Sequence, residues 1–183
     1  MAAVNDTLGS PPVMVVGGSP GCGKTSVSRL LALGDPMGVH IESDHFFDFL
    51  AHKIDPSMPA ARTQNETVVQ SYGAAARAYA MGGYAVYLDG VIGPWMLPLL
   101  TPILGEIDYV LLHAAEAVTL DRLKSRKGQA SARPSVALRM YKQFAAIVGE
   151  YQRHVVRTDG RDLDAILDEI HARRGQGDFR LLT

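Results

Sequence analysis

The chain has 183 residues, of which 47% are apolar and 20% are charged, and its formal net charge is −1. A nearly neutral chain has no overall field that would attract nucleic acid or an anionic membrane, so neither is expected as a partner. The single cysteine, Cys22, excludes an internal disulfide and is typical of a reducing cytoplasm. No apolar run approaches the roughly 18 residues of a membrane span, and the N-terminus does not read as a signal peptide. We expect one cytoplasmic domain over residues 1–183.

Short apolar runs alternate along the chain with segments of helical periodicity. Strands are expected at residues 13–16, 39–42, 84–88, 107–112 and 154–156. Helices are expected at residues 26–33, from the capping box Thr63-x-x-Glu66 to the glycines at 82 and 83, at 116–127, from Pro134 onward, and around 163–170. This alternation predicts an α/β sandwich in which helices cover both faces of a five-stranded parallel sheet.

Two of the expected helices carry apolar faces that should enter the core. The face of the first consists of Val69, Tyr72, Ala76 and Tyr79. The face of the second consists of Ala137, Tyr141, Phe144, Val148 and Tyr151. We interpret these aromatic side chains as core residues rather than as part of a ligand site.

Residues 18–25 read GSPGCGKT, which matches the phosphate-binding pattern GxxxxGK[ST] at every fixed position. Glycines let the backbone curl so that successive N–H groups point at phosphate oxygens, and the following helix adds partial positive charge. Lys24 is expected to reach the terminal phosphates, and the hydroxyl of Thr25 to bind Mg²⁺. The expected nucleotide-binding residues are Gly18, Ser19, Pro20, Gly21, Cys22, Gly23, Lys24, Thr25 and Ser26. The loop therefore predicts ATP and Mg²⁺ as cofactors.

A guanine-reading Asn-Lys-x-Asp motif, typical of GTPases with this loop, was sought and rejected. Its nearest match is His52-Lys53-Ile54-Asp55, which lacks the asparagine and lies before the third expected strand. ATP is therefore favoured over GTP.

In length, strand pattern and loop position the chain resembles the small P-loop kinases, which include adenylate, shikimate and gluconate kinases and chloramphenicol phosphotransferase. The stretch GGSPGCGKTS and the aspartate after the second strand make it most similar to the chloramphenicol phosphotransferase and gluconate kinase branch. The resemblance implies a nucleoside-monophosphate-kinase-like fold with a lid segment near residues 122–135. It also implies transfer of the terminal phosphoryl group of ATP to a hydroxyl group of a small acceptor.

Two aspartates follow the second and third expected strands, at the edge where ligands of parallel sheets bind. By the resemblance, Asp44 is the catalytic base that accepts the proton of the attacking hydroxyl. Asp89 ends an apolar strand, as does the aspartate that holds Mg²⁺ through water in P-loop proteins. Each has a plainer alternative: Asp44 as the N-cap of a helix beginning at His45, and Asp89 as a turn residue before Gly90.

Arginines gather where the resembling kinases have their lid. Arg122 and Arg126 lie four residues apart on one expected helical face, and Arg133 follows shortly after. Lid arginines neutralise charge that develops on the transferred phosphoryl group. We assign Arg122 to nucleotide binding and Arg126 and Arg133, with Lys24 and Asp44, to catalysis. The alternative is a solvated basic face.

The segment between Asp44 and Trp95 should shape the acceptor site. It is rich in aromatic residues and has Lys53, Arg62 and Arg77 as its basic residues. A nucleoside monophosphate would require several arginines for bidentate phosphate capture. The segment favours a neutral or weakly charged hydroxyl compound, such as an antibiotic or a sugar acid. A nucleotide kinase and an ATP-binding regulatory protein without an acceptor remain the alternatives.

Overall fold

The computed structural model describes residues 13–125 and 134–181. Five parallel strands form one sheet in the order β2-β3-β1-β4-β5. The strands are β1 Val13–Gly18, β2 Gly38–Glu42, β3 Ala85–Asp89, β4 Ile107–His113 and β5 Val155–Arg157. The helices are α1 Lys24–Gly34, α2 His45–Asp48, α3 Arg62–Met81, α4 Leu97–Leu104, α5 Glu116–Ser125, α6 Pro134–Ile147 and α7 Leu163–Gly175. The predicted α/β fold with a five-stranded parallel sheet is confirmed.

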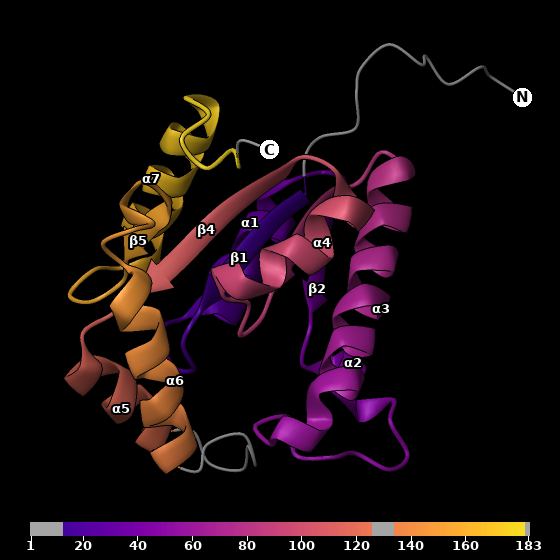
Figure 1. Cartoon of the computed structure of the whole chain (residues 1–183). Coiled ribbons are helices and arrows are strands. Elements are labelled where there is room, and N and C mark those ends of the chain that lie inside the picture. Colours follow the sequence, from indigo (N-terminus) through magenta and orange to yellow (C-terminus); the bar gives the residue numbers. More distant parts are fainter. Residues whose placement is uncertain (1–12, 126–133, 182–183) are drawn as a thin grey trace, which may run out of the picture.

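Helices cover both faces of the sheet, with α3 and α4 on one face and α1 and α7 on the other (Figure 1). Successive side chains of β1 enter the two cores in turn: Val13 and Val15 pack on the α3 side, and Met14 and Val16 on the α1 side. A strand covered on both faces needs apolar residues at every position, which is why its sequence is a continuous apolar run.

The strand register brings several chain segments to one edge of the sheet. Gly18 at the end of β1 pairs with Leu112, and Glu42 at the end of β2 pairs with Asp89. The ends of β2 and β3 approach so closely that a Cβ at Gly90 would lie 1.9 Å from the Ser43 Oγ. The segments after β1, β2 and β3 therefore meet at the carboxyl edge of the sheet, where ligands of such folds bind.

Several local predictions are wrong. Thr63 does not begin a capping box, because a 3₁₀ turn at Pro59–Ala61 leads directly into α3, which begins at Arg62 and has no side-chain cap. Glu66 instead forms a surface ion pair with Arg62 at 2.8 Å. Tyr79 is 47% exposed and lies outside the core, whereas the other three residues of that predicted face are buried.

Other boundaries shifted by small amounts. Helix α6 ends at Ile147, so the last two residues of its predicted apolar stripe, Val148 and Tyr151, follow the helix and are half-buried. Helix α4 was not predicted.

Among the described residues, no helix combines the length and apolar character that crossing a bilayer requires.

Candidate nucleotide and phosphoryl-transfer site

The phosphate-binding loop runs from the end of β1 into the first turn of α1. Gly18, Gly21 and Gly23 have φ angles of 146°, 86° and 101°, which L side chains rarely adopt. A Cβ at Gly18 would also lie 2.5 Å from the carbonyl oxygen of Leu112 in β4. Within the described structure no side chain caps the N-terminus of α1, so its first N–H groups face the loop. The backbone is thus shaped as a cradle for phosphate oxygens.

Two polar side chains of the loop also fit a phosphate ligand. Lys24 is 8% exposed, and its Nζ donates a hydrogen bond to the carbonyl oxygen of Ser19 at 3.0 Å. The Ser19 Oγ is buried and has no hydrogen-bond partner among the described residues. A buried hydroxyl without a partner carries a desolvation cost, which a phosphate oxygen would relieve.

The two residues predicted to hold Mg²⁺ are in direct contact. The Thr25 Oγ1 donates to the Asp89 Oδ2 at 2.9 Å, and Asp89 is 1% exposed. The strand register explains the contact, because Val16 of β1 pairs with Asp89 and the loop follows β1 immediately. Hydroxyl and carboxylate oxygens are ligands that Mg²⁺ prefers. The residues present therefore fit the metal that the loop implies.

His40 was missed by the sequence analysis. Its Nε2 lies 2.7 Å from the Asp89 Oδ1, so the buried carboxylate has one partner on each oxygen, His40 and Thr25. The sequence gives no local signal for this contact, because the contact depends on the register of β2 against β3: His40 and Glu42 share a face of β2, and Glu42 pairs with Asp89.

Asp44 lies between β2 and α2, near Lys24 and Asp89. Asp44 is exposed at its surface, but the surrounding protein partly desolvates the carboxylate and so raises the pKa of Asp44. The charge of Lys24 opposes this rise in pKa, and the negative charge of Asp89 adds to it. Asp44 occupies the N-cap position of α2, but its side chain makes no cap hydrogen bond and its backbone is helical. The geometry gives no support to the capping alternative.

No protein-family model matches the chain, and no curated protein matches it. A sugar kinase from Janibacter sp. HTCC2649 has a similar structure, with a TM-score of 0.69 and 16% identity over 90% of this chain and 95% of that one. A gluconokinase from Sinorhizobium meliloti 1021 gives a TM-score of 0.59 and 22% identity over 92% of this chain and 94% of that one. The chain therefore shares the α/β fold of these two proteins.

Within this fold a cavity of about 250 Å³ opens beside the phosphate-binding loop. It is lined by Gly21, Cys22, Gly23, Ser26, Val27, Arg122, Ser125, Thr158, Arg161, Leu163 and Ile166. The walls combine apolar side chains with two guanidinium groups, as expected of a pocket for a nucleotide base and ribose. The predicted nucleotide-binding residue Arg122 therefore lies next to the loop that it was expected to assist.

Arg122 is tied to the loop through Thr158, which follows β5. Its guanidinium donates to the Thr158 Oγ1 at 3.2 Å and to the Thr158 carbonyl oxygen at 3.1 Å. The Thr158 hydroxyl in turn donates to the carbonyl oxygen of Cys22 at 2.9 Å. Arg122 thus fixes one wall of the cavity against the loop.

Arg122→Met is expected to weaken ADP binding by about 10-fold or more, because hydrogen bonds from a charged group are each worth ~1.5–3 kcal/mol. Isothermal titration of the variant with ADP measures the effect. Lys142→Met, which removes an exposed cation from α6, is the matched control and should bind ADP like the wild type. Equal ADP affinity in the Arg122 variant and the control would contradict the assignment.

The other two predicted lid arginines, Arg126 and Arg133, lie outside the described residues. Their assignment to catalysis stays a prediction. The flanking helices α5 and α6 stand together on one side of the carboxyl edge, and α2 and α3 stand on the other (Figure 1).

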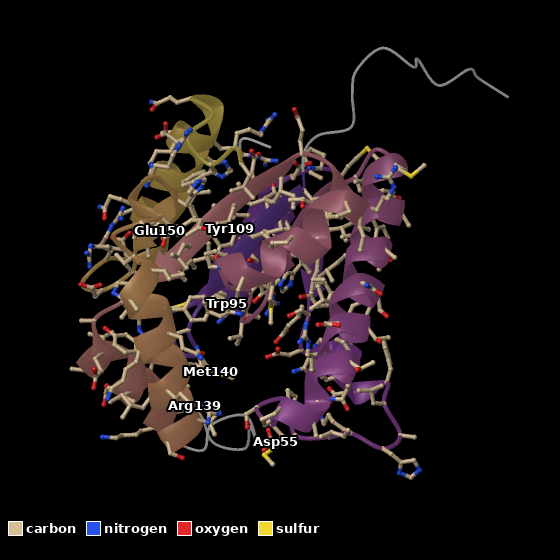
Figure 2. The ribbon with its side chains drawn as sticks, in the orientation of Figure 1. Asp55, Trp95, Tyr109, Arg139, Met140 and Glu150 are labelled. Carbon is tan, nitrogen blue, oxygen red and sulfur yellow. The ribbon has the colours of Figure 1, made fainter. Side chains whose placement is uncertain are left out.

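Aromatic and apolar side chains face this edge from η2 (Pro94–Met96) and α6. Trp95 is 48% exposed, and its ring packs on Phe144 of α6 with ring centroids 5.1 Å apart. Met140 lies one helical turn before Phe144 and points from α6 toward the side of α3 (Figure 2). An exposed indole against a packed ring offers a flat apolar surface for a small acceptor.

The lysine and arginines of the segment predicted to shape the acceptor site each have a protein partner. Lys53 pairs with Asp48 at 3.2 Å and Arg62 with Glu66 at 2.8 Å. Arg77 donates to the carbonyl oxygen of Ile103 at 2.7 Å. These three are the lysines and arginines of residues 38–104, so that segment presents no cluster of guanidinium groups to an anionic acceptor.

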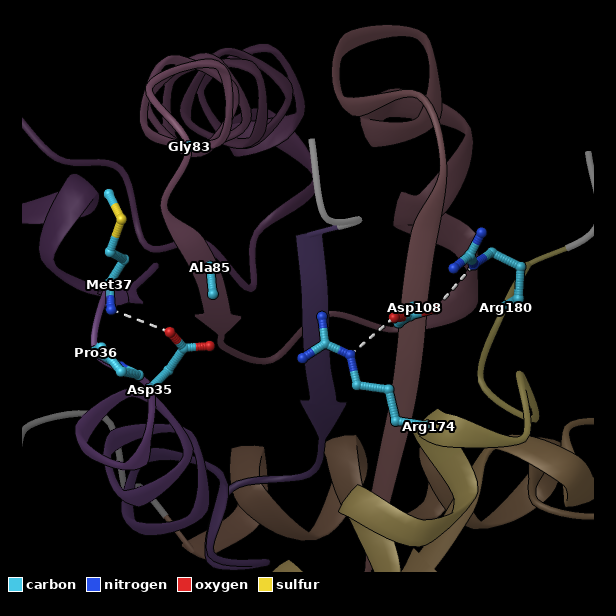
Figure 3. A pocket seen from close by; sticks show the side chains of 8 residues that line it. All are labelled: Asp35, Pro36, Met37, Gly83, Ala85, Asp108, Arg174 and Arg180. Carbon is cyan, nitrogen blue, oxygen red and sulfur yellow. Dashed lines mark hydrogen bonds and ion pairs between the residues drawn. The ribbon is translucent and has the colours of Figure 1, made fainter. Parts of the chain in front are cut away.

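A larger cavity, of about 520 Å³, lies at the opposite edge of the sheet, where the strands begin (Figure 3). Arg174 and Arg180 converge there on the buried Asp108, at 3.1 and 3.0 Å. Arg180 also pairs with Glu106 at 2.6 Å. These ion pairs fasten the last turn of α7 and the chain after it to the start of β4, and we interpret the cluster as structural.

Proposed function

We propose that the protein is an ATP-dependent small-molecule kinase that transfers the terminal phosphoryl group of ATP to a hydroxyl group. The observation that carries the proposal is the meeting of three groups at one sheet edge: the loop with Lys24, the Thr25–Asp89 pair, and the Asp44 carboxylate. Phosphoryl transfer requires positioning, charge neutralisation and a proton acceptor for the attacking oxygen. These groups supply all three.

The chain's own residues have separate tasks in this proposal. The loop N–H groups and Lys24 bind the phosphates, and Asp44 accepts the proton of the acceptor hydroxyl as the new O–P bond forms. Mg²⁺, held by Thr25 and by Asp89 through water, would neutralise phosphate charge when bound. Arg122 orders the nucleotide cavity through its bonds to Thr158.

The acceptor is proposed to be a neutral or weakly charged hydroxyl compound. Support comes from the exposed Trp95 surface and from the engaged state of Lys53, Arg62 and Arg77. The structural neighbours named as a sugar kinase and a gluconokinase point to sugars and sugar acids as the first compounds to test. A nucleotide kinase is the second candidate and is less well supported, because phosphate capture needs guanidinium groups.

A screen for ADP release over sugars, sugar acids, hydroxyl-bearing antibiotics and nucleoside monophosphates tests the proposal. A positive compound should gain the mass of one phosphoryl group. ADP formation only with a nucleoside monophosphate would establish the nucleotide kinase instead. Nucleotide binding with no phosphorylated product from any class would favour the regulatory alternative.

Mg²⁺ with ATP is expected to raise the melting temperature, because a ligand that binds the folded state alone stabilises it by mass action. At 100 times its Kd the ligand would add about 2.7 kcal/mol. GTP should raise the melting temperature less, and NAD should leave it unchanged. Differential scanning fluorimetry with the three nucleotides measures these shifts in melting temperature. A larger shift with GTP than with ATP would overturn the assignment of ATP as the nucleotide.

A further inference from the structure

Asp89 is held from two sides by side chains of different strands and loops. The Thr25 Oγ1 bonds one carboxylate oxygen at 2.9 Å, and the His40 Nε2 lies 2.7 Å from the other. Asp89 is 1% exposed, and these two side chains are the ones that bond its carboxylate in the described structure. The orientation of the carboxylate therefore depends on these two contacts.

The sheet explains why a histidine can make this contact. In β2, His40 and Glu42 point to the same face, and they pair with Tyr87 and Asp89 of β3. The imidazole extends along the strand from the position opposite Tyr87 and reaches the Asp89 Oδ1 with its far nitrogen. The other carboxylate oxygen of Asp89, Oδ2, faces Thr25 on the side of the phosphate-binding loop.

We propose that His40 is a positioning residue for the metal: by donating its Nε2–H to one oxygen of Asp89, it keeps the other oxygen directed at the Thr25 hydroxyl. The inference rests on the proposed function, because Thr25 and Asp89 are the residues that would hold Mg²⁺. Partners that orient a metal-binding carboxylate affect metal affinity by about 10- to 100-fold when they are lost. His40 itself need not contact nucleotide or acceptor.

A purely structural role is the alternative, since any buried polar contact contributes to stability. The chain offers a comparison in His154, which is buried and bonds a backbone carbonyl, that of Tyr109, at 3.0 Å, whereas His40 is half-buried. His154 lies just before β5, and β1 and β4 separate β5 from β3, the strand that carries Asp89. Replacing it removes a buried histidine contact without touching Asp89.

The experiment compares His40→Leu, His40→Asn, His40→Gln and the control His154→Leu in the full chain. Glutamine can place an N–H where the Nε2 lies, whereas asparagine is polar but too short, and leucine has no donor. For each folded variant, calorimetry measures ADP affinity in EDTA and at increasing Mg²⁺, and electron paramagnetic resonance measures Mn²⁺ binding in the presence of ADP.

His40→Leu and His40→Asn should bind ADP normally in EDTA but require at least about 10-fold more metal to reach full affinity. His40→Gln should recover most of the metal affinity. His154→Leu should lower the melting temperature but leave the metal affinity unchanged. Wild-type metal affinity in either His40→Leu or His40→Asn would overturn the inference, as would a His40→Gln protein no better than His40→Asn. Failure of the wild type to bind ADP with metal would instead overturn the proposed function.

Discussion

Lys24→Ala is expected to lower turnover by at least about 10²- to 10³-fold, the loss that follows removal of one preorganised group that stabilises transition-state charge. Lys24 is almost fully buried, and its ammonium donates to the carbonyl oxygen of Ser19 in the phosphate-binding loop. The ammonium bonds a neutral carbonyl oxygen rather than a carboxylate, so its charge is available to an incoming anion. The terminal phosphate of ATP is the anion that the loop would place there.

The same variant should remain folded, because removal of a desolvated charge offsets part of the packing that is lost with the aliphatic stem of Lys24. Turnover and ADP affinity are measured with an acceptor from the screen, and circular dichroism verifies the fold. Lys142→Ala, on the exposed surface of α6, is the control for loss of a lysine as such. Near-normal turnover in folded Lys24→Ala protein would remove the central element of the proposed function.

The phosphate-binding loop and the strands were predictable because their signals are local. The loop's glycines and lysine are required by the backbone conformation and the ligand, and the conformation is present: Gly18, Gly21 and Gly23 all have positive φ. The central strands β1, β3 and β4 are buried at every position, so their sequences are largely apolar. In both cases the residues that create the signal also make the structure.

Helix α4 could not be predicted, because its local sequence argues against a helix. Its sequence, LPLLTPIL, has Pro98 in the first turn and Pro102 inside, and Pro102 has no N–H to donate to the carbonyl four residues earlier. The helix exists because Leu97 and Leu100 are buried, and Leu100 packs close to Gly73 of α3. Tertiary packing overrides local propensity here.

Only those parts of the site that belong to sequence motifs or strand ends were predictable. Asp44 and Asp89 stand at strand ends, and the rule for parallel sheets places them at one edge. The His40–Asp89 contact follows from the pairing of β2 with β3, two strands separated by the whole of α3. A non-local register leaves no motif in the sequence, so the contact emerged only from the fold.

Asp44→Asn is expected to lower turnover by about 10²- to 10⁴-fold, the range for loss of a general base. Asparagine keeps the shape of the side chain but cannot take the proton of the acceptor hydroxyl. ADP affinity should be unchanged or slightly higher, because a negative charge near the phosphates is gone. Asp48→Asn is the control, since Asp48 is an exposed carboxylate at the other end of α2 that pairs with Lys53.

The pH dependence gives the same assignment an independent test. Desolvation raises the pKa of Asp44 above the ordinary aspartate value, and a base acts only when ionised. Wild-type kcat/KM should therefore fall as the pH is lowered through that raised pKa, and Asp44→Asn should lose this acid limb. Because the folded protein binds the Asp44 proton more tightly than the unfolded chain, ionised Asp44 lowers stability as the pH rises through its folded pKa. At neutral pH Asp44→Asn should melt at the same temperature as the wild type or higher.

These expectations separate a base from a helix cap. Asparagine caps helices about as well as aspartate, and Asp44 makes no cap hydrogen bond in any case. A cap would therefore leave turnover and its acid limb unchanged in Asp44→Asn, whereas a base would lose both while stability is kept. Turnover above about a third of the wild-type value, well outside the general-base range, would rule out the catalytic role of Asp44.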